Sequence, residues 1–154
     1  ISANSKYDRV TRDHSATFSR LEQQGYELFQ AKCASCHKGS LFTDESFRNI
    51  GFPEHPDTVE ESGRGRVTGS EDDLYRFRVP SLRNIAYTAP YGSFGQFASL
   101  KEVLDYFDQG VLDYPNLDPI LKNNNRRIPL TEAEKEALIA FMQTLSDPQF
   151  IGRE

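Results

Sequence analysis

The sequence has few of the residues that hold metals or form cross-links. Its 154 residues include two cysteines, three histidines and one methionine, and tryptophan is absent. A structural zinc site usually takes four protein ligands. Such a site would therefore have to combine the two cysteines with His14 or His55, because there is no second cysteine pair.

Long apolar runs, repeats and an excess of positive charge are also missing. No stretch of about 18 apolar residues occurs, which argues against a membrane-spanning helix. The formal net charge is -5, which argues against nucleic acid as a partner. No internal repeat or low-complexity tract is present, and 154 residues predict one domain with a sizeable core.

Both cysteines belong to one motif, Cys33-Ala34-Ser35-Cys36-His37. The pattern C-x-x-C-H is typical of covalent attachment of c-type haem. The two thiols bond to the two vinyl groups of one porphyrin, and the next residue offers a ring nitrogen to the iron. A thioredoxin-like redox pair would need a βαβ pattern, and none is visible. We therefore predict one covalent haem c, held by Cys33 and Cys36, with His37 as the proximal iron ligand.

The chain starts at Ile1 without a methionine or a signal peptide. Because c-type haem is attached outside the cytoplasm, we expect that an export signal preceded Ile1. The predicted location is periplasmic or otherwise extracytoplasmic.

Three capping boxes predict three helices. In this motif a Ser or Thr at the N-cap and a Glu three residues later each bond to a backbone N–H group of the other. The motifs start at Ser19, Ser99 and Thr131, and the first helix is expected to end at about Lys32, just before the haem motif.

The first and last of these helices are expected to pack on each other. Gly25 lies on the apolar face of the first helix, where a missing side chain permits close approach of a second helix. Met142 is expected to fill the core rather than to bind iron. The apolar faces comprise Leu21, Leu28 and Phe29 in the first helix, Leu100, Val103, Leu104 and Phe107 in the second, and Leu138, Phe141, Met142 and Leu145 in the last.

The remaining segments are predicted to be irregular. Residues 1–18 are expected to form an extended connector with His14 in solvent, and residues 38–80, with His55 in a loop, to wrap a ligand. The candidates for lining the porphyrin, or simply for filling the core, are Phe42, Phe47, Ile50 and Phe52. The candidates for pairing with haem propionates are Arg64, Arg66, Arg76, Arg78 and Arg83.

Helix, C-x-x-C-H, wrapping loops and a closing helix predict an all-α cytochrome c fold over residues 19–154. Further motifs follow in order: Leu41–Asp44, Asn49–Gly51, Gly65–Gly69, Phe77–Asn84, Thr88–Tyr91 and Phe97–Val103. Together they resemble the C-terminal haem domain of bacterial di-haem cytochrome c peroxidases and their MauG-like relatives. The family's inter-haem tryptophan belongs to the other domain, in keeping with the absence of tryptophan here.

The resemblance implies an electron-transfer domain of a peroxidase-like oxidoreductase. It would accept electrons from a small donor protein and pass them to an N-terminal haem domain, in the same protein or in a second subunit. Residues 1–18 resemble the connector between the two domains. The carbonyl groups of Thr88 and Pro90 match positions that help to bind calcium between the domains.

Two positions depart from the family pattern. Ser93 stands where the family usually has a histidine, and Phe107 stands in the slot of the second axial ligand, which is methionine in the peroxidases and tyrosine in MauG. Phenylalanine has no lone pair to give. We therefore predict a haem with His37 as its only protein ligand and Phe107 over the open face.

Two other functions stay open. The chain would act as a stand-alone single-haem electron carrier or structural subunit if the intact polypeptide had no second C-x-x-C-H before Ile1. The other alternative is a MauG-like oxidation of side chains in a partner protein.

Overall fold

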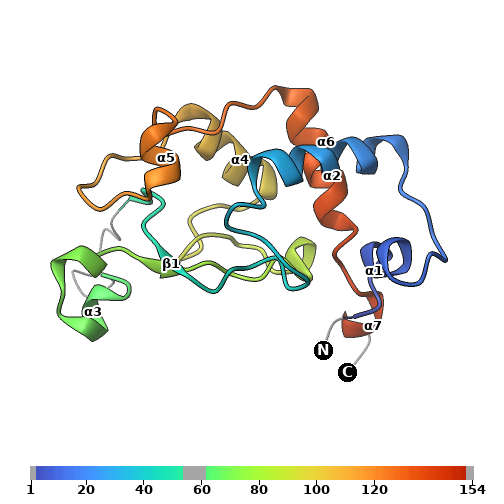
Figure 1. Cartoon of the computed structure of the whole chain (residues 1–154), viewed down its shortest axis with the longest axis horizontal. Helices are drawn as coiled ribbons and strands as arrows, with labels where there is room; N and C mark the ends of the chain where they lie inside the picture. The colour runs from blue at the N-terminus through green and yellow to red at the C-terminus, as the bar shows by residue number, and fades with distance from the viewer. Residues whose placement is uncertain (1–2, 54–61, 152–154) are drawn as a thin grey trace. The chain divides into compact units, whose positions relative to one another are not determined.

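The computed structural model describes residues 3–53 and 62–151 (Figure 1). The chain divides into two compact units. Unit 1 comprises Ile1–Asp44, Pro80–Ala89 and Thr131–Glu154, and unit 2 comprises Glu45–Val79 and Pro90–Leu130. The predicted haem motif thus belongs to unit 1. Within the described ranges, no helix has both the length and the apolar character needed to cross a bilayer.

Unit 1 contains two long helices, α2 (Arg20–Lys32) and α6 (Glu132–Gln143). Both begin with the predicted capping box, which confirms the first and last helices of the sequence analysis. Three shorter elements accompany them: α1 (Lys6–Thr11), the 3-10 helix η2 (Ile85–Tyr87) and α7 (Pro148–Ile151).

The two long helices cross at Gly25, as predicted. Gly25 is buried, and a Cβ atom on it would overlap the carbonyl oxygen of Ala137 and lie 2.8 Å from the Cβ atom of Phe141. An ion pair of 3.2 Å between Lys32 and Glu134 links the same two helices. The crossing therefore fixes the end of α2, where the haem motif begins.

Six aromatic rings form the core around this crossing. The ring centroid of Phe29 lies 5.1 Å from that of Phe141 and 5.7 Å from that of Phe42. This aromatic cluster comprises Tyr7, Phe18, Tyr26, Phe29, Phe42 and Phe141. Met142 is buried, as predicted, whereas Leu21, expected on the apolar face of the first helix, is exposed.

The N-terminal segment is not extended throughout. Lys6–Thr11 form α1, which has its own capping box between Ser5 and Asp8, so the prediction of an extended segment is wrong for these residues. The backbone N–H of Tyr7 donates to the carbonyl of Thr144 at 3.0 Å. Asp8 pairs with Arg83 at 2.7 Å. Distant partners hold this helix, and the local sequence shows no helical period.

Unit 2 contains the second predicted helix, α4 (Leu100–Gln109), with Ser99 as its N-cap. Unit 2 also contains five short elements: β1 (Phe47–Arg48), α3 (Gly65–Thr68), η1 (Glu71–Asp73), β2 (Phe77–Arg78) and α5 (Pro119–Asn123). Strands β1 and β2 pair antiparallel, with Phe47 opposite Arg78. The fold is therefore mostly helical with a small sheet, and not all-α as predicted. Strands of two residues are too short to show an alternating pattern.

The side chain of Phe107 packs against the core of unit 2. Three buried residues, Val111, Leu117 and Leu121, form this core, and Phe107 packs against them partly buried. The carbonyl of Phe107 also accepts the N–H of Ile128 at 2.8 Å. Phe107 is thus held by both its ring and its backbone.

We expect Gly25→Ala to destabilise the protein by about 1–3 kcal/mol, because the new methyl group would overlap the backbone of α6. The sign of the change in stability tests the close contact, because a change from Gly to Ala inside a helix ordinarily stabilises a protein by about 1 kcal/mol. Urea denaturation measures the change. The control is Gln24→Ala, an exposed neighbour in α2, which should be nearly neutral. Equal or higher stability of Gly25→Ala would contradict the crossing.

The Asp8–Arg83 pair predicts a pH dependence of stability. Burial by itself raises the pKa of Asp8, but hydrogen bonds from Arg83 and Ser5 outweigh it and hold the pKa below its usual value. A carboxyl group with a depressed folded pKa stabilises the fold above its unfolded pKa of about 4. That contribution is lost as the pH falls through the folded pKa.

We therefore expect Asp8→Asn to lower the free energy of unfolding at neutral pH by roughly 3 kcal/mol. The variant should also lose less stability than the parent protein as the pH falls below about 4. Urea titrations at several pH values measure both effects, with Glu27→Gln on the exposed side of α2 as the control. If the free energy of unfolding changed with pH in the same way for Asp8→Asn and the parent, the stabilising role of the Asp8 carboxylate would be contradicted.

Candidate haem site

The haem motif continues α2 as a tight turn. Cys33 is the C-cap residue of α2, and its N–H donates to the carbonyl of Phe29 at 2.8 Å. The N–H groups of Cys36 and His37 then both donate to the carbonyl of Cys33, at 3.2 and 3.0 Å. The two cysteines form no disulfide. One turn of backbone thus presents both thiols together, as bonding to one porphyrin edge requires.

The thiol of Cys33 does not have the character of a reactive cysteine. Burial raises its pKa to about 12, whereas redox-active cysteines typically have a lowered pKa. Among the residues that the structure describes, no three His, Cys, Asp or Glu side chains gather where they could hold a metal ion.

The ring of His37 has a defined orientation. Its Nδ1 atom lies 3.0 Å from the carbonyl oxygen of Phe42, and since a carbonyl can only accept, Nδ1 carries the proton. The lone pair that an iron ligand needs then resides on Nε2. A hydrogen bond of this kind fixes the tautomer of a metal-ligating histidine and raises its basicity. His37 therefore fits the predicted role of proximal ligand.

Arg83, predicted to contact a propionate, has several protein partners. It donates to both carboxylate oxygens of Asp8, at 2.7 and 2.9 Å, and to the hydroxyl of Ser5 at 3.2 Å. Its Nε–H donates to the carbonyl of Ser40 at 2.9 Å. A guanidinium has five N–H donors, so these bonds use most of them. Contact between Arg83 and a propionate stays a prediction.

The other arginines predicted as candidates for pairing with haem propionates belong to unit 2. Arg64 pairs with Asp73 at 3.0 Å and Arg78 pairs with Glu45 at 3.1 Å, while Arg66 is exposed. Arg76 differs, because its buried Nε atom has no hydrogen-bond partner in the described part of the chain.

A sequence profile described as cytochrome c matches residues 22–146, most of the chain. The chain belongs to the cytochrome c family. The matched range contains Cys33, Cys36 and His37, all of α6 and most of α2.

Within cytochrome c, two kinds of relative are similar to this chain. Cytochrome-c peroxidase IdrP1 of Denitromonas iodatirespirans is 33% identical over an alignment of 169 positions, gaps included. The alignment covers 91% of the chain and 44% of the relative. Methylamine utilization protein MauG of Methylorubrum extorquens is 33% identical over 149 residues, 94% of the chain and 40% of the relative. The predicted resemblance to the C-terminal haem domain of these proteins is confirmed. The chain spans less than half the length of either relative.

Solved structures give the same fold. The crystal structure of a MauG-like protein associated with microbial copper homeostasis has a TM-score of 0.82 and 30% identity, covering 99% of this chain and 54% of that one. The dihaem peroxidase BthA from Burkholderia thailandensis E264 has a TM-score of 0.75 and 23% identity, covering 97% and 48%. The cytochrome c-like fold predicted from the sequence is confirmed.

Other predicted site residues lie in different parts of this cytochrome c chain. Thr88 belongs to unit 1 and Pro90 to unit 2, and both are exposed. Ser93 is exposed in unit 2, and His55 lies outside the described residues. The calcium site and the position of Phe107 over the haem stay predictions.

The four candidates for lining the porphyrin also divide between the units. Phe42 is buried in the aromatic cluster of unit 1, where it contributes to the core. Phe47 lies beneath the guanidinium of Arg64, which is 4.8 Å from the ring centroid. Ile50 packs against the core of unit 2, and Phe52 lies 5.5 Å from the ring of Phe97. Contact with the porphyrin stays a prediction for all four.

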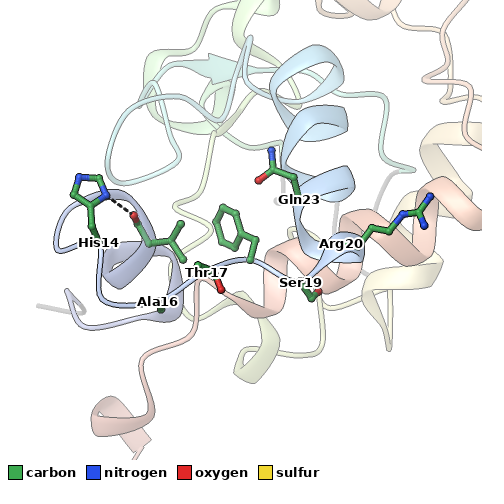
Figure 2. A pocket seen from close by; sticks show the side chains of 8 residues that line it. His14, Ala16, Thr17, Ser19, Arg20 and Gln23 are labelled. Atoms are coloured by element: carbon green, nitrogen blue, oxygen red, sulfur yellow. Dashed lines mark hydrogen bonds between the residues drawn. The ribbon is translucent and has the colours of Figure 1, made fainter.

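A separate surface pocket of about 600 Å³ lies between the end of α1 and the start of α2 (Figure 2). His14, predicted to be in solvent, is exposed at its edge, and its Nδ1 lies 3.1 Å from the carbonyl of Val10. The lining also includes Phe18 and Arg20. No residue of the haem motif lines this pocket, so it is distinct from the haem site.

Sequence reasoning missed the two groups that complete the site. The Phe42 carbonyl orients His37, but a backbone group has no signature in the sequence. Asp8 anchors Arg83, and its signal was present as a capping box from Ser5 to Asp8, in the less usual form with Asp at the third position.

We expect Cys36→Ala to lose most of the covalent holoprotein, because only one thiol would remain to bond with the porphyrin. Haem staining after denaturing electrophoresis measures the loss. The control is Ser35→Ala, an exposed residue between the two cysteines, which should keep the stain. Haem that is extracted from the parent protein by acid-acetone would contradict covalent attachment.

Proposed function

We propose that this chain is the electron-transferring, C-terminal c-type haem domain of a di-haem cytochrome c peroxidase-like oxidoreductase. The observation that carries the proposal is the Cys33–His37 turn, in which the proton on Nδ1 of His37 is held by a carbonyl. The relatives of this chain are named as peroxidases and MauG proteins, which supports the class of reaction.

In the proposed site each residue of the motif has one task. Cys33 and Cys36 hold one haem c by two thioether bonds, and His37 binds the iron through Nε2. Bound haem supplies a metal that gains and loses one electron. The hydrogen bond between His37 and the Phe42 carbonyl keeps the ring from rotating, so the ligand geometry is set before an electron arrives.

The partners of the chain follow from the same proposal. Electrons come from a small donor protein and pass to an N-terminal haem domain, either in the same polypeptide or in a second subunit. Residues 1–18 contribute to the connector, and the carbonyl groups of Thr88 and Pro90 contribute to calcium binding between the domains. A carboxylate of the haem would satisfy the buried Nε of Arg76. The proposed location is the periplasm or another extracytoplasmic compartment.

Two alternatives retain the haem but change its use. A single-haem carrier or structural subunit would have no catalysis of its own. A MauG-like protein would oxidise side chains of a partner protein, an alternative favoured by the TM-score of 0.82 with a MauG-like structure.

Mass spectrometry of the intact native protein tests the proposal, because it reports chain length and haem count together. We expect two haems in the native polypeptide or complex, and oxidation of a reduced small cytochrome that depends on hydrogen peroxide. A single-haem protein without peroxide turnover would replace the proposal with the carrier. Oxidation of partner side chains in place of the small cytochrome would replace it with the MauG-like function.

The distal side of the iron gives a separate prediction. With Phe107 in the slot of the second axial ligand, the ferric protein should be high-spin or water-ligated, because phenylalanine has no lone pair. Phe107→Met should shift the optical and EPR spectra toward a six-coordinate His/Met haem. The control is Phe97→Met, an aromatic residue of the same unit outside that slot. A low-spin parent spectrum with methionine, histidine or tyrosinate character would contradict an open site.

A further inference from the structure

The short turn that carries the carbonyl partner of His37 is held from outside by a separate segment. The hydroxyl of Ser81 donates to the carbonyl of Leu41 at 2.6 Å. Arg83 donates to the carbonyl of Ser40 at 2.9 Å, and its guanidinium lies 5.4 Å from the ring centroid of Phe42. Three successive residues of the turn are therefore contacted by one stretch of chain that lies about 40 residues further on.

The turn needs this support because its backbone is unfavourable. Phe42 has a φ of 54°, and a left-handed conformation costs a residue with a side chain roughly 1–3 kcal/mol. Such a residue keeps this conformation only when the surrounding structure determines it. The ring of Phe42 is 2% exposed in the aromatic cluster, and Ser81 and Arg83 hold the carbonyl groups that precede its own.

The guanidinium of Arg83 is itself fixed by contacts with α1 and its N-cap residue. Two bonds to the carboxylate of Asp8 and one to the hydroxyl of Ser5 anchor the guanidinium to α1. The side chains of Arg83 and Asp8 are only 11% and 8% exposed, so water screens the pair little. A continuous set of contacts thus leads from α1 through Arg83 and the Ser40–Phe42 turn to the Nδ1 of His37.

We infer that Arg83 and Ser81 are positioning residues for the proximal iron ligand. They hold the turn whose carbonyl accepts the hydrogen bond from Nδ1–H of His37, and thereby set the strength of that hydrogen bond. This inference rests on the proposed attachment of haem to Cys33 and Cys36. It gives Arg83 a role at the haem that does not depend on contact with a propionate.

The expected effect is on the redox equilibrium of the iron. A strong hydrogen bond from Nδ1 makes the imidazole a better electron donor, which stabilises the ferric state relative to the ferrous state. Loosening the turn weakens this bond and favours reduction. We expect a change on the order of tenfold in the ferric–ferrous equilibrium constant, which for a one-electron couple is a rise of about 59 mV in midpoint potential.

The test is potentiometric titration of the haem in the holoprotein as isolated. Ser81→Ala removes two hydrogen bonds, one to the Leu41 carbonyl and one from the backbone N–H of Arg83, and little volume. Arg83→Met removes the guanidinium but keeps much of its length. Both should raise the midpoint potential, while Ser81→Thr, which retains a hydroxyl, should restore the parent value. If Arg83→Met does not fold, the Ser81 pair decides the question.

The matched control is Thr131→Ala, which removes the N-cap of α6 in the same unit and should destabilise it by about 1 kcal/mol. Thr131 forms hydrogen bonds with Glu134 and Lys135 at the start of α6, so this variant should lower stability without moving the potential. If Ser81→Ala and Arg83→Met bind haem but keep the parent midpoint potential, the inference is overturned and the proposed function is not. A parent protein without covalent haem would overturn the proposed function and the inference with it.

Discussion

The backbone contact between α2 and α6 at Gly25 underlies the organisation of unit 1. Because no side chain separates the two helices there, they approach closely enough for Phe29 and Phe141 to bring the aromatic cluster together. Helix α2 runs directly into Cys33. The place of Cys33 is therefore a consequence of helix packing. The loop that follows helps to place Cys36, whose carbonyl accepts the N–H of Asp44 at 2.9 Å.

Orientation of His37, the proposed iron ligand, is a stricter requirement, and different contacts meet it. The ring of His37 is aligned by one hydrogen bond to a backbone carbonyl. That carbonyl belongs to a strained turn, and polar groups from Ser81 and Arg83 hold the turn. A functional group on a rigid support keeps its geometry through a reaction. In the proposed electron-transfer site, little of the ligand shell would have to move when the charge on the metal changes.

The sequence predicted the elements that depend on local rules. Capping boxes located the starts of α2 and α6, and apolar periodicity with Gly25 predicted their crossing. Helix α1 was missed because Thr144 and Arg83, its partners, lie far away in the chain. The small sheet was missed because each strand has two residues. The motif predicted Cys33, Cys36 and His37 as haem-binding residues, but the carbonyl that aligns His37 depends on a fold that the motif does not encode.

Unit 1 is assembled from three separated stretches of chain, and this has a consequence for the order of events in biogenesis. The C-x-x-C-H segment leaves the ribosome, or a translocation channel, well before the segments that later support it. Glu134, which pairs with Lys32, follows it by 102 residues, and contacts of such long range form late in folding. If haem is attached as proposed, the motif would be a pliable peptide when an attachment enzyme meets it. Contacts with the last helix would then make the same residues rigid, so the covalent bonds would form before the environment of the metal is set.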